Sequence, residues 1–409
     1  MPEIGNAARR DVDARLEEAA GLAEAIGIDV QDRVHFRVRA PRPATLFGKG
    51  QVESIAEAVR MAEAELLIVD ASITPIQQKN LETETKAKVI DRTGLILEIF
   101  GERAATAEGR LQVELAHLDY QAGRLVRSWT HLERQRGGFG FLGGPGETQI
   151  EADRRLIRDR MAKLKRELEQ VTRTRGLHRA RRQKAPWPVV ALVGYTNAGK
   201  STLFNRLTRA EVMAEDLLFA TLDPTLREIS MPGVSKAILS DTVGFISDLP
   251  TQLVAAFRAT LEEVLAADLI VHVRDISHAD SDAQRQDVEQ VLKELGIGEG
   301  APVIEAWNKV DRLGDEEAAS LRAEAARRED VVVLSAISGE GVDDLLACTA
   351  EHLSKGAQLR EVVLGAGDGE AMAWLHQHGE VLSQESEEMQ TRLTVRMGPA
   401  EWERFESRR

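Results

Sequence analysis

Residues 194–201 read GYTNAGKS, and this stretch decides the fold of the region around it. It follows VVALVG at 189–194, a continuous apolar run typical of a parallel strand that is buried on both faces. It precedes STLFNRLT, which has the composition of a helix. A glycine-rich turn between a buried strand and a helix is the context that a phosphate-binding loop requires. The sequence therefore predicts a nucleotide-binding domain with a parallel sheet.

Each residue of this loop has an expected role toward the nucleotide. Backbone N–H groups and the positive end of the helix can hold the α- and β-phosphates. The Lys200 ammonium can reach the β and γ oxygens as a catalytic group, and the Ser201 hydroxyl can ligate Mg²⁺. The loop residues predicted to bind the nucleotide are Gly194, Tyr195, Thr196, Asn197, Ala198, Gly199, Lys200 and Ser201.

A second motif, DTVG, follows the apolar stretch AILS. Asp241 at the end of that strand can hold Mg²⁺ through water, and the Gly244 N–H can contact the γ-phosphate as a catalytic group. Thr242 and Val243 complete this part of the predicted site. Many GTPases next place a glutamine that orients the attacking water, but Phe245 cannot make that hydrogen bond. We therefore predict slow hydrolysis by the isolated protein and acceleration by a partner, with the water-positioning residue unassigned.

Two further motifs predict that the base is guanine. The Asp311 carboxylate of NKVD can accept hydrogen bonds from N1–H and N2–H of guanine, whereas adenine has no matching donor pair. The stretch SAI would place a backbone N–H at guanine O6. The predicted base-binding residues are Asn308, Lys309, Val310, Asp311, Ser335, Ala336 and Ile337. Each motif alone is also typical of a charged turn, but their ordered occurrence after apolar strands predicts GTP and GDP.

A switch threonine is expected between the phosphate loop and Asp241. FATLDPT at 219–225 lies there, and a threonine in it should close on Mg²⁺ when the γ-phosphate is present. The residues alone leave both Thr221 and Thr225 as candidates.

Residues 1–105 are predicted to form a small α/β domain. VHFRVR at 34–39 alternates like a strand, 51–64 has a helical pattern, and LLIVD at 66–70 is typical of a buried strand. GKG at 48–50 lacks the second spaced glycine and the Lys-Ser pair of a phosphate loop. We interpret it as a helix-capping turn and predict no nucleotide site in this region.

Residues 106–184 are predicted to form a long antiparallel helical hairpin. Its glycine-rich tip at 137–146 holds six glycines, too many for a helix to cross, and Thr148 can cap the second helix. Such a tip suits insertion into a phosphate-lined cavity, and a flexible connector fits the residues equally well. Apolar residues at alternating spacings of four and three form the seam: Leu111, Leu115, Leu118, Ala122, Leu125, Trp129 and Leu132, then Ile157, Met161, Leu164, Leu168 and Val171.

The remaining chain divides at about Ser354. Residues 185–355 are predicted to form the GTPase domain, because the prolines of APWP end the hairpin and strand–helix alternation follows. Residues 356–409 are predicted to form a small α+β domain. The predicted fold class is therefore α/β, a P-loop GTPase domain with a parallel sheet between the two N-terminal parts and this tail.

Charge and composition limit the partners. The net charge of −14 argues against a protein that coats nucleic acid over its whole surface. Residues 154–184, however, carry thirteen Lys or Arg and only Asp159, Glu167 and Glu169 as acids, which indicates either a local nucleic-acid contact or a solvated helix face. No apolar run is long enough for a bilayer or a signal peptide, so we expect a cytoplasmic protein without membrane insertion. The single cysteine, Cys348, is interpreted as a small buried residue.

With these residues placed, the chain closely resembles the HflX family of translation-associated GTPases. The strings that carry the resemblance cover most of residues 45–345: FGKGQVESI, DRTGLILEIFGERAATAEGRLQVELAHLDY, GGPGETQIEADRR, GYTNAGKSTLFN, FATLDPT and DTVGF.

The resemblance implies a cytoplasmic GTPase that binds the large (50S) ribosomal subunit, both its rRNA and its proteins, near the peptidyl-transferase centre. It implies splitting or rescue of stalled ribosomes under heat or other stress, with the hairpin entering the ribosome. By similarity, FATLD marks Thr221 as the residue that closes on Mg²⁺. The neighbours placed with it in the nucleotide site are Phe219, Ala220, Leu222 and Asp223.

Two other functions fit the same motifs. One is a ribosome-assembly GTPase that acts as a GTP-dependent switch on immature subunits. The other is a GTP-regulated module whose hairpin docks a protein and contacts no RNA. The sequence offers no argument for an interface between copies, so we expect a monomer.

Overall fold

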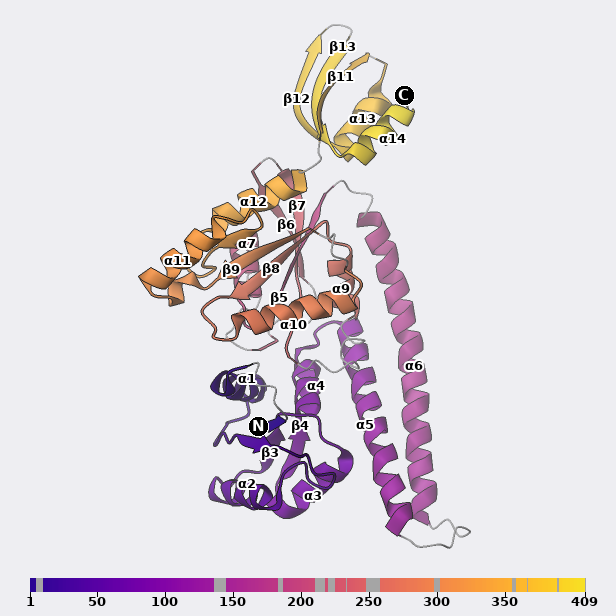
Figure 1. Ribbon diagram of the computed structural model, residues 1–409. Helices are drawn as coiled ribbons and strands as arrows, with labels where there is room; N and C mark the ends of the chain where they lie inside the picture. Colours follow the sequence, from indigo (N-terminus) through magenta and orange to yellow (C-terminus); the bar gives the residue numbers. More distant parts are fainter. Residues whose placement is uncertain are drawn as a thin grey trace.

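The structure is a computed structural model. It describes residues 1–4, 10–135, 145–182, 187–209, 218–219, 225–232, 234–247, 258–297, 302–354, 358–365, 367–387 and 390–408. Figure 1 shows four consecutive parts: an N-terminal α/β part, a helical hairpin beside it, a domain built on a mainly parallel sheet, and a C-terminal sheet with two helices at the other end.

The N-terminal part alternates strands and helices, as its sequence pattern predicts. Strand β1 pairs with β2 and β3 with β4, both in parallel. Gly48 is the N-cap of α2, so GKG is a helix start, and the Thr74 and Asp91 side chains cap α3 and α4. The elements are β1 Pro2–Ile4, α1 Val12–Glu24, β2 Phe36–Val38, α2 Lys49–Met61, β3 Leu66–Val69, α3 Pro75–Thr85, β4 Lys88–Asp91 and α4 Arg92–Arg103.

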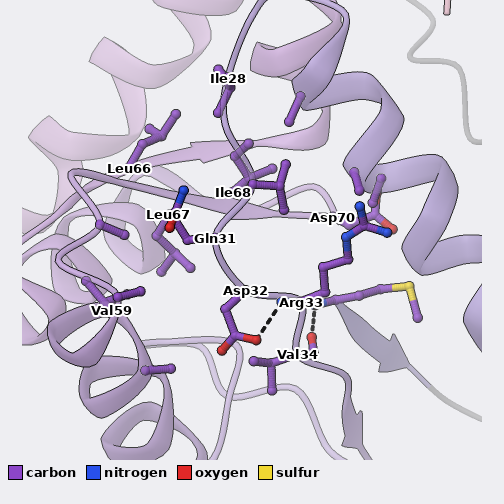
Figure 2. Close-up of a pocket in the computed structure, with 18 of the residues that line it drawn as sticks. Ile28, Gln31, Asp32, Arg33, Val34, Val59, Leu66, Leu67, Ile68 and Asp70 are labelled. Atoms are coloured by element: carbon purple, nitrogen blue, oxygen red, sulfur yellow. Dashed lines mark hydrogen bonds between the residues drawn. The ribbon is translucent and has the colours of Figure 1, made fainter.

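A cavity of about 180 Å³ lies in this part, between α1, α2 and β3 beneath the irregular segment 28–34. Figure 2 shows its wall, which is formed mainly by alanines and aliphatic side chains. At its rim the Arg33 guanidinium donates to the Glu24 carboxylate at 3.2 Å. The residues that line it include no glycine-rich turn of the kind that holds phosphate.

The hairpin consists of α5 Ala107–Gln135 and α6 Pro145–Arg182, which lie side by side (Figure 1). Leu164 of the predicted seam is fully buried, and Arg160 of α6 pairs with Glu114 of α5 at 2.6 Å. Helix α6 begins at Pro145, so the expected cap at Thr148 is wrong. Proline suits the first turn of a helix because its missing N–H would have no intrahelical partner there. Positions 137–144 of the predicted tip lie outside the described residues.

Helix α5 buries a second face that its seam does not reveal. Val113 and Ala116 are nearly inaccessible and belong to the same core as the apolar residues of α4. His117 contacts the Leu97 carbonyl oxygen at 3.1 Å. Helix α5 is therefore packed between α6 and the N-terminal part.

The third part is built on a sheet with strand order β10-β9-β8-β5-β7-β6, parallel except for β6. Helices α7 and α12 pack on one face, and α9 and α10 on the other. Its elements are β5 Val189–Gly194, α7 Lys200–Thr208, β6 Thr225–Met231, β7 Val234–Asp241, α9 Arg258–Leu265, β8 Leu269–Asp275, α10 Ser281–Glu294, β9 Val303–Asn308, the 3₁₀ turn η1 Val310–Arg312, α11 Asp315–Ala325, β10 Val331–Val333 and α12 Val342–Ser354.

One apolar core joins this sheet to the N-terminal part and to α5. It contains Phe100 of α4, Val113 of α5, and Val193 of the central strand β5. The rings of Phe100 and Phe219 meet edge to face, with their centroids 4.8 Å apart. The N-terminal part therefore shares one apolar core with the side of the sheet that carries α9 and α10.

The C-terminal part is an antiparallel sheet with strand order β11-β13-β12 and two helices packed on one face. Trp374, Trp402 and Phe405 form the centre of its core. Its elements are β11 Gln358–Gly365, α13 Gly369–His378, β12 Glu380–Glu387, β13 Gln390–Met397 and α14 Pro399–Arg408. Within the described chain, no helix combines the length and apolarity that crossing a membrane requires.

Replacing Leu164 by alanine tests the hairpin packing. Because this side chain is fully buried, we expect a loss of about 2–5 kcal/mol in the free energy of unfolding of the region it stabilises, from lost apolar burial and a residual cavity. Leu156→Ala is the matched control, since Leu156 lies on the same helix and is 67% exposed. Urea denaturation followed by circular dichroism measures both, and equal losses would contradict the packing.

Candidate functional site

The predicted phosphate loop lies at the carboxyl end of β5, between Gly194 and the start of α7. A Cβ atom on Gly194 would collide with the Val273 carbonyl oxygen of β8. Gly199 has φ +94°, and a Cβ there would collide with the Asn308 side chain. Both positions need glycine because the loop lies directly against the neighbouring strands. The loop therefore has the tight, backbone-lined shape that can cradle phosphate.

Lys200 opens α7 and is buried against this loop. Its ammonium donates to the carbonyl oxygens of Tyr195 at 2.7 Å and Gly194 at 3.1 Å. Burial lowers the pKa of Lys200 to about 8, although attraction to Asp241 acts in the opposite direction. A phosphate in the loop would add negative charge beside this buried cation and favour its charged form.

Ser201 and Asp241 meet beside the phosphate loop. The Ser201 hydroxyl donates to an Asp241 carboxylate oxygen at 2.9 Å. The Thr242 hydroxyl donates to the Leu192 carbonyl oxygen at 2.6 Å and fixes the end of β7 to β5. Hydroxyl and carboxylate oxygens are ligands that Mg²⁺ accepts, so this pair fits the predicted metal position. Of the two switch candidates, Thr225 is the first residue of β6, and Thr221 with its neighbours 220 and 222–224 lies outside the described residues.

Phe245 is a core residue whose backbone holds the phosphate loop. Its N–H donates to the Gly194 carbonyl at 3.1 Å, and its carbonyl accepts from the Thr196 N–H at 2.7 Å. Its ring is 2% exposed and packs in the core shared with the N-terminal part. Gly244 lies so close to Thr196 that a Cβ would meet its Cα at 2.9 Å. Phe245 therefore fixes the DTVG segment to the loop, and its ring is directed into the core.

Asn308 connects the phosphate loop to the predicted base site. Its amide donates to the Ala198 carbonyl at 2.8 Å and its side-chain oxygen accepts from the Ala336 N–H at 2.9 Å. Lys309 pairs with Asp275 at 2.8 Å and adopts φ +68°. Asp311 lies in the 3₁₀ turn η1 that follows Lys309, and its side chain is exposed and accessible to a base. The predicted NKVD and SAI motifs are therefore brought together at one edge of the sheet.

Arg206 contacts the loop that holds the predicted base-binding residues, and no sequence motif indicated this contact. From the last turn of α7 its guanidinium donates to the Ala336 carbonyl at 2.6 Å and to the Ile337 carbonyl. Gly339 has φ +95°, a backbone conformation that favours glycine, and a Cβ there would lie 2.6 Å from the Arg206 guanidinium. The position of Arg206 on the helix that begins at Lys200 was the feature of the sequence that could have indicated this contact. Arg206 thus holds the loop that is expected to contact guanine.

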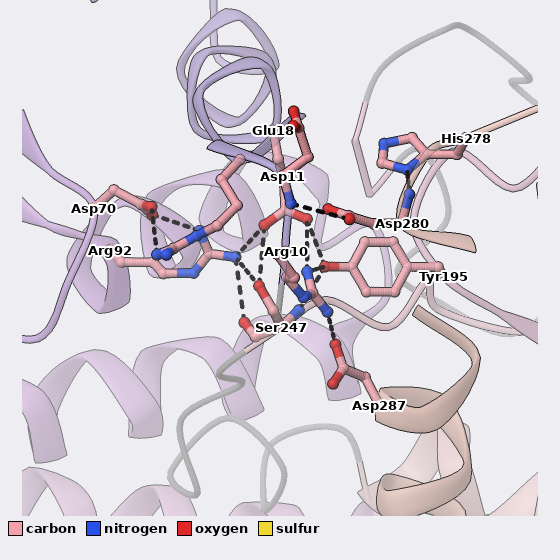
Figure 3. Close-up of polar contacts among 11 residues, drawn as sticks. Arg10, Asp11, Glu18, Asp70, Arg92, Tyr195, Ser247, His278, Asp280 and Asp287 are labelled. Atoms are coloured by element: carbon pink, nitrogen blue, oxygen red, sulfur yellow. Dashed lines mark hydrogen bonds and ion pairs between the residues drawn. The ribbon is translucent and has the colours of Figure 1, made fainter. Parts of the chain in front are cut away.

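Tyr195 joins the phosphate loop to the N-terminal part, as Figure 3 shows. Its hydroxyl donates to Glu18 of α1 at 2.5 Å and accepts from Arg10 at 3.1 Å and from the Ser247 N–H at 2.8 Å. Burial, followed by the charge of Glu18, raises the pKa of Tyr195 to about 12, so the hydroxyl stays protonated. Arg10 also pairs with Asp287 of α10. No sequence pattern indicated this cluster, because its members lie far apart along the chain.

Family profiles match the chain along its length. Residues 13–101 match GTP-binding GTPase N-terminal and 103–182 match GTP-binding GTPase Middle Region. Residues 189–309 match a profile described as 50S ribosome-binding GTPase, and 320–409 match HflX C-terminal domain.

Curated relatives are similar over nearly the whole chain. GTPase HflX of Magnetococcus marinus is 51% identical over 385 residues, which cover 94% of this chain and 88% of the relative. GTPase HflX of Escherichia coli is 44% identical over 391 residues, covering 95% and 91%. Among solved structures, a GTP-binding protein of Sulfolobus solfataricus in complex with GDP is 24% identical, with a TM-score of 0.45 and coverage of 87% of this chain and 98% of that one.

The lowered pKa of Lys200 predicts proton uptake on nucleotide binding. Above about pH 8 much of the nucleotide-free protein carries neutral Lys200, and bound phosphate favours the charged form. Affinity for GTP should therefore fall as pH rises from about 7.5 to 9, with proton uptake at about pH 8.5, well above the phosphate pKa of about 6. Calorimetry in buffers of different ionisation enthalpy measures the uptake. Equal uptake at pH 7.5 and 8.5 would contradict the assignment, and Lys200→Arg should show none.

Replacing Arg206 by alanine should loosen the base site. Two loop carbonyls lose a charged donor, so we expect affinity for GDP to fall by roughly tenfold. Arg60→Ala is the control, because Arg60 is an exposed arginine on α2 far from the site. Titration with a fluorescent GDP derivative measures both variants. Unchanged affinity of Arg206→Ala would show that the loop keeps its shape without this residue.

Proposed function

This chain belongs to the HflX family of GTPases, and from that premise we propose that it binds the large (50S) ribosomal subunit and splits or rescues stalled ribosomes under heat or other stress. It is a GTP hydrolase that produces GDP and phosphate. We also propose a role for each site residue and a dependence of GTP hydrolysis on the ribosomal target.

The hairpin is the observation that carries the proposed partner. Helix α6 has 38 residues, about 57 Å at 1.5 Å per residue, and forms a long arm beside the N-terminal part (Figure 1). Arg155, Arg158 and Lys165 are exposed along it in a chain of net charge −14. An exposed basic arm on an acidic protein suits a local contact with the phosphates of ribosomal RNA. The family profile that names the 50S subunit covers the adjoining domain.

In the proposed site, Lys200 holds the β and γ oxygens and the Gly244 N–H contacts the γ-phosphate. Ser201 would ligate Mg²⁺ directly, Asp241 would hold it through water, and Thr221 would close on it when GTP is bound. Mg²⁺ would neutralise charge that develops on the phosphates. Asp311 accepts from guanine, and Arg206 keeps the loop at Ala336 in place.

Slow hydrolysis by the isolated protein follows from the surroundings of Phe245. Its ring is buried in the core, so the position that often holds a glutamine offers no group to orient water. We infer that the ribosomal subunit either supplies that group or positions one from this chain. Fast turnover by the isolated protein would refute this.

Cosedimentation with purified large subunits at several salt concentrations tests the partner. The triple variant Arg155→Gln/Arg158→Gln/Lys165→Gln should bind more weakly, with a salt slope lower by roughly one for each phosphate that it no longer neutralises. The matched control is Lys49→Gln/Arg60→Gln/Lys79→Gln, which removes exposed cations from α2 and α3. Equal binding by both variants would refute α6 as the contact.

Two further measurements separate the candidate functions. Deleting 137–146 should abolish hydrolysis stimulated by the subunit and spare nucleotide binding, and unchanged stimulation would refute the role of the tip. Light scattering of intact ribosomes with GTP should show their splitting. Stimulated hydrolysis without loss of the joined particle would favour an assembly GTPase instead.

A further inference from the structure

Arg92 binds the segment that follows the γ-phosphate contact. This residue opens α4, and its guanidinium donates to the Ser247 hydroxyl at 2.9 Å and the Ser247 carbonyl at 3.2 Å. The same group donates to Glu18 and to Asp70, both at 2.5 Å (Figure 3). Ser247 stands three residues after Gly244. Arg92 therefore reaches from the N-terminal part to a segment that must respond to GTP.

Asp91, the preceding residue, binds the hairpin. Its carboxylate accepts from the Tyr120 hydroxyl at 2.7 Å and from the Arg124 guanidinium at 2.6 Å, both on α5. It also accepts from the N–H groups of Gly94 and Ile73, which fix its orientation. Asp91 is 1% exposed. Adjacent residues at the junction of β4 and α4 thus hold the hairpin and the GTPase domain.

Helix α4 offers a second contact with the nucleotide-responsive segments. Phe100 packs edge to face on Phe219, two residues before the proposed switch threonine. Leu218 lies against Gly21 of α1, because a Cβ built on this glycine would lie 3.3 Å from the Leu218 side chain. Helix α4 is buried along Leu95, Ile96, Leu97, Ile99 and Phe100, so a displacement at either end moves the helix as a unit.

We propose that Arg92 is a positioning residue for GTP hydrolysis, and that the Asp91–Arg92 pair couples the nucleotide state of the switch segments to the middle of helix α5 of the hairpin. GTP orders the segment after Gly244, and Ser247 then favours one position of Arg92 and α4. Asp91 passes that preference to Tyr120 and Arg124. By reciprocity, a load on the hairpin changes the preferred state of the nucleotide site. The identity of that load as ribosomal RNA rests on the proposed function.

Hydrogen exchange of the full chain tests the coupling without a ribosome. Residues 107–124 should exchange at different rates with GDP and with a non-hydrolysable GTP analogue. In Ser247→Ala and in Tyr120→Phe this nucleotide-dependent ratio should fall by roughly fivefold, the effect of one hydrogen bond on an equilibrium constant. The double variant should lose no more than either single variant, because both interrupt one connection.

Controls separate coupling from loss of structure. Ser54→Ala removes a hydroxyl that bonds within α2, and Arg160→Gln removes the exposed ion pair between α5 and α6. Both should keep the nucleotide-dependent ratio. Affinity for GDP should stay within about twofold of the parent in Ser247→Ala, since Ser247 contacts the loop from outside. Arg92→Lys keeps the charge but not the planar fork, and should behave like Ser247→Ala if its thermal melt shows it folded.

Either of two hydrogen-exchange results would overturn the proposal. The parent protein could show no nucleotide-dependent exchange on α5, or Ser247→Ala and Tyr120→Phe could keep the full difference. Failure to bind large subunits in the cosedimentation experiment would refute the proposed function and leave this coupling standing. Intact subunit binding with stimulated kcat unchanged in Ser247→Ala would refute the coupling alone.

Discussion

The apolar core around Phe100, Phe219 and Phe245 is the constraint on which the other arrangements depend. Two of these rings come from segments predicted to lie next to the phosphates and one from α4, so the predicted nucleotide site packs partly on the N-terminal part. Removing these rings from water favours docking of the two parts by roughly 1.5–3 kcal/mol for each fully buried side chain. The backbone hydrogen bond between Phe245 and Gly194 forms beside this shared core, so the shape of the phosphate loop depends on the docking of the two parts.

Buried charges make that arrangement specific. Burial by itself would raise the pKa of Glu18, but attraction to Arg92 and hydrogen bonds from Tyr195 and Arg92 lower it, so the carboxylate stays ionised. On β9, burial is likewise outweighed for Glu305, which accepts hydrogen bonds from Trp307, Arg274 and Arg328 that lower its pKa to about 2. A buried charge without its partner is costly. An apolar interface can slide slightly without a large loss of free energy. These buried charged pairs instead fix the relative position of the elements that carry them.

The sequence predicted what depends on local spacing and missed what depends on distant pairing. GYTNAGKS, DTVG and NKVD each stand at the end of an apolar strand, and the fold places them at one edge of one sheet. Periodicity also predicted that Leu164 lies in the hairpin seam, and this side chain is fully buried. Tyr195, however, meets Glu18 across 177 positions, and no periodicity reveals such a pairing. The second buried face of α5 was missed for a related reason. Val113 and Ala116 do not form an apolar pattern along α5, and their burial depends on contact with α4.

Phe245 shows how a motif comparison can be correct and incomplete. Its residue type excludes the hydrogen bond of a glutamine, which the sequence shows directly. That its ring belongs to a core shared between two parts of the chain depends on packing, which the motif does not describe. The switch residues 220–224 and most of the glycine-rich tip lie outside the described residues, so their predicted roles remain predictions.

Helix α7 gives the site a fixed length. Lys200 is the first of its nine residues and Arg206 lies six positions later, a rise of about 9 Å along the helix from the phosphate loop to the predicted base loop. The Asn308 side chain also connects the same two loops, through its hydrogen bonds with Ala198 and Ala336. In the proposed site, a nucleotide that contacts both loops must have its base and its phosphates at a separation that this spacing allows. The proposed contacts to the nucleoside therefore belong to elements other than the proposed switch segments, so binding the nucleotide and sensing its γ-phosphate would rest on different parts of the chain.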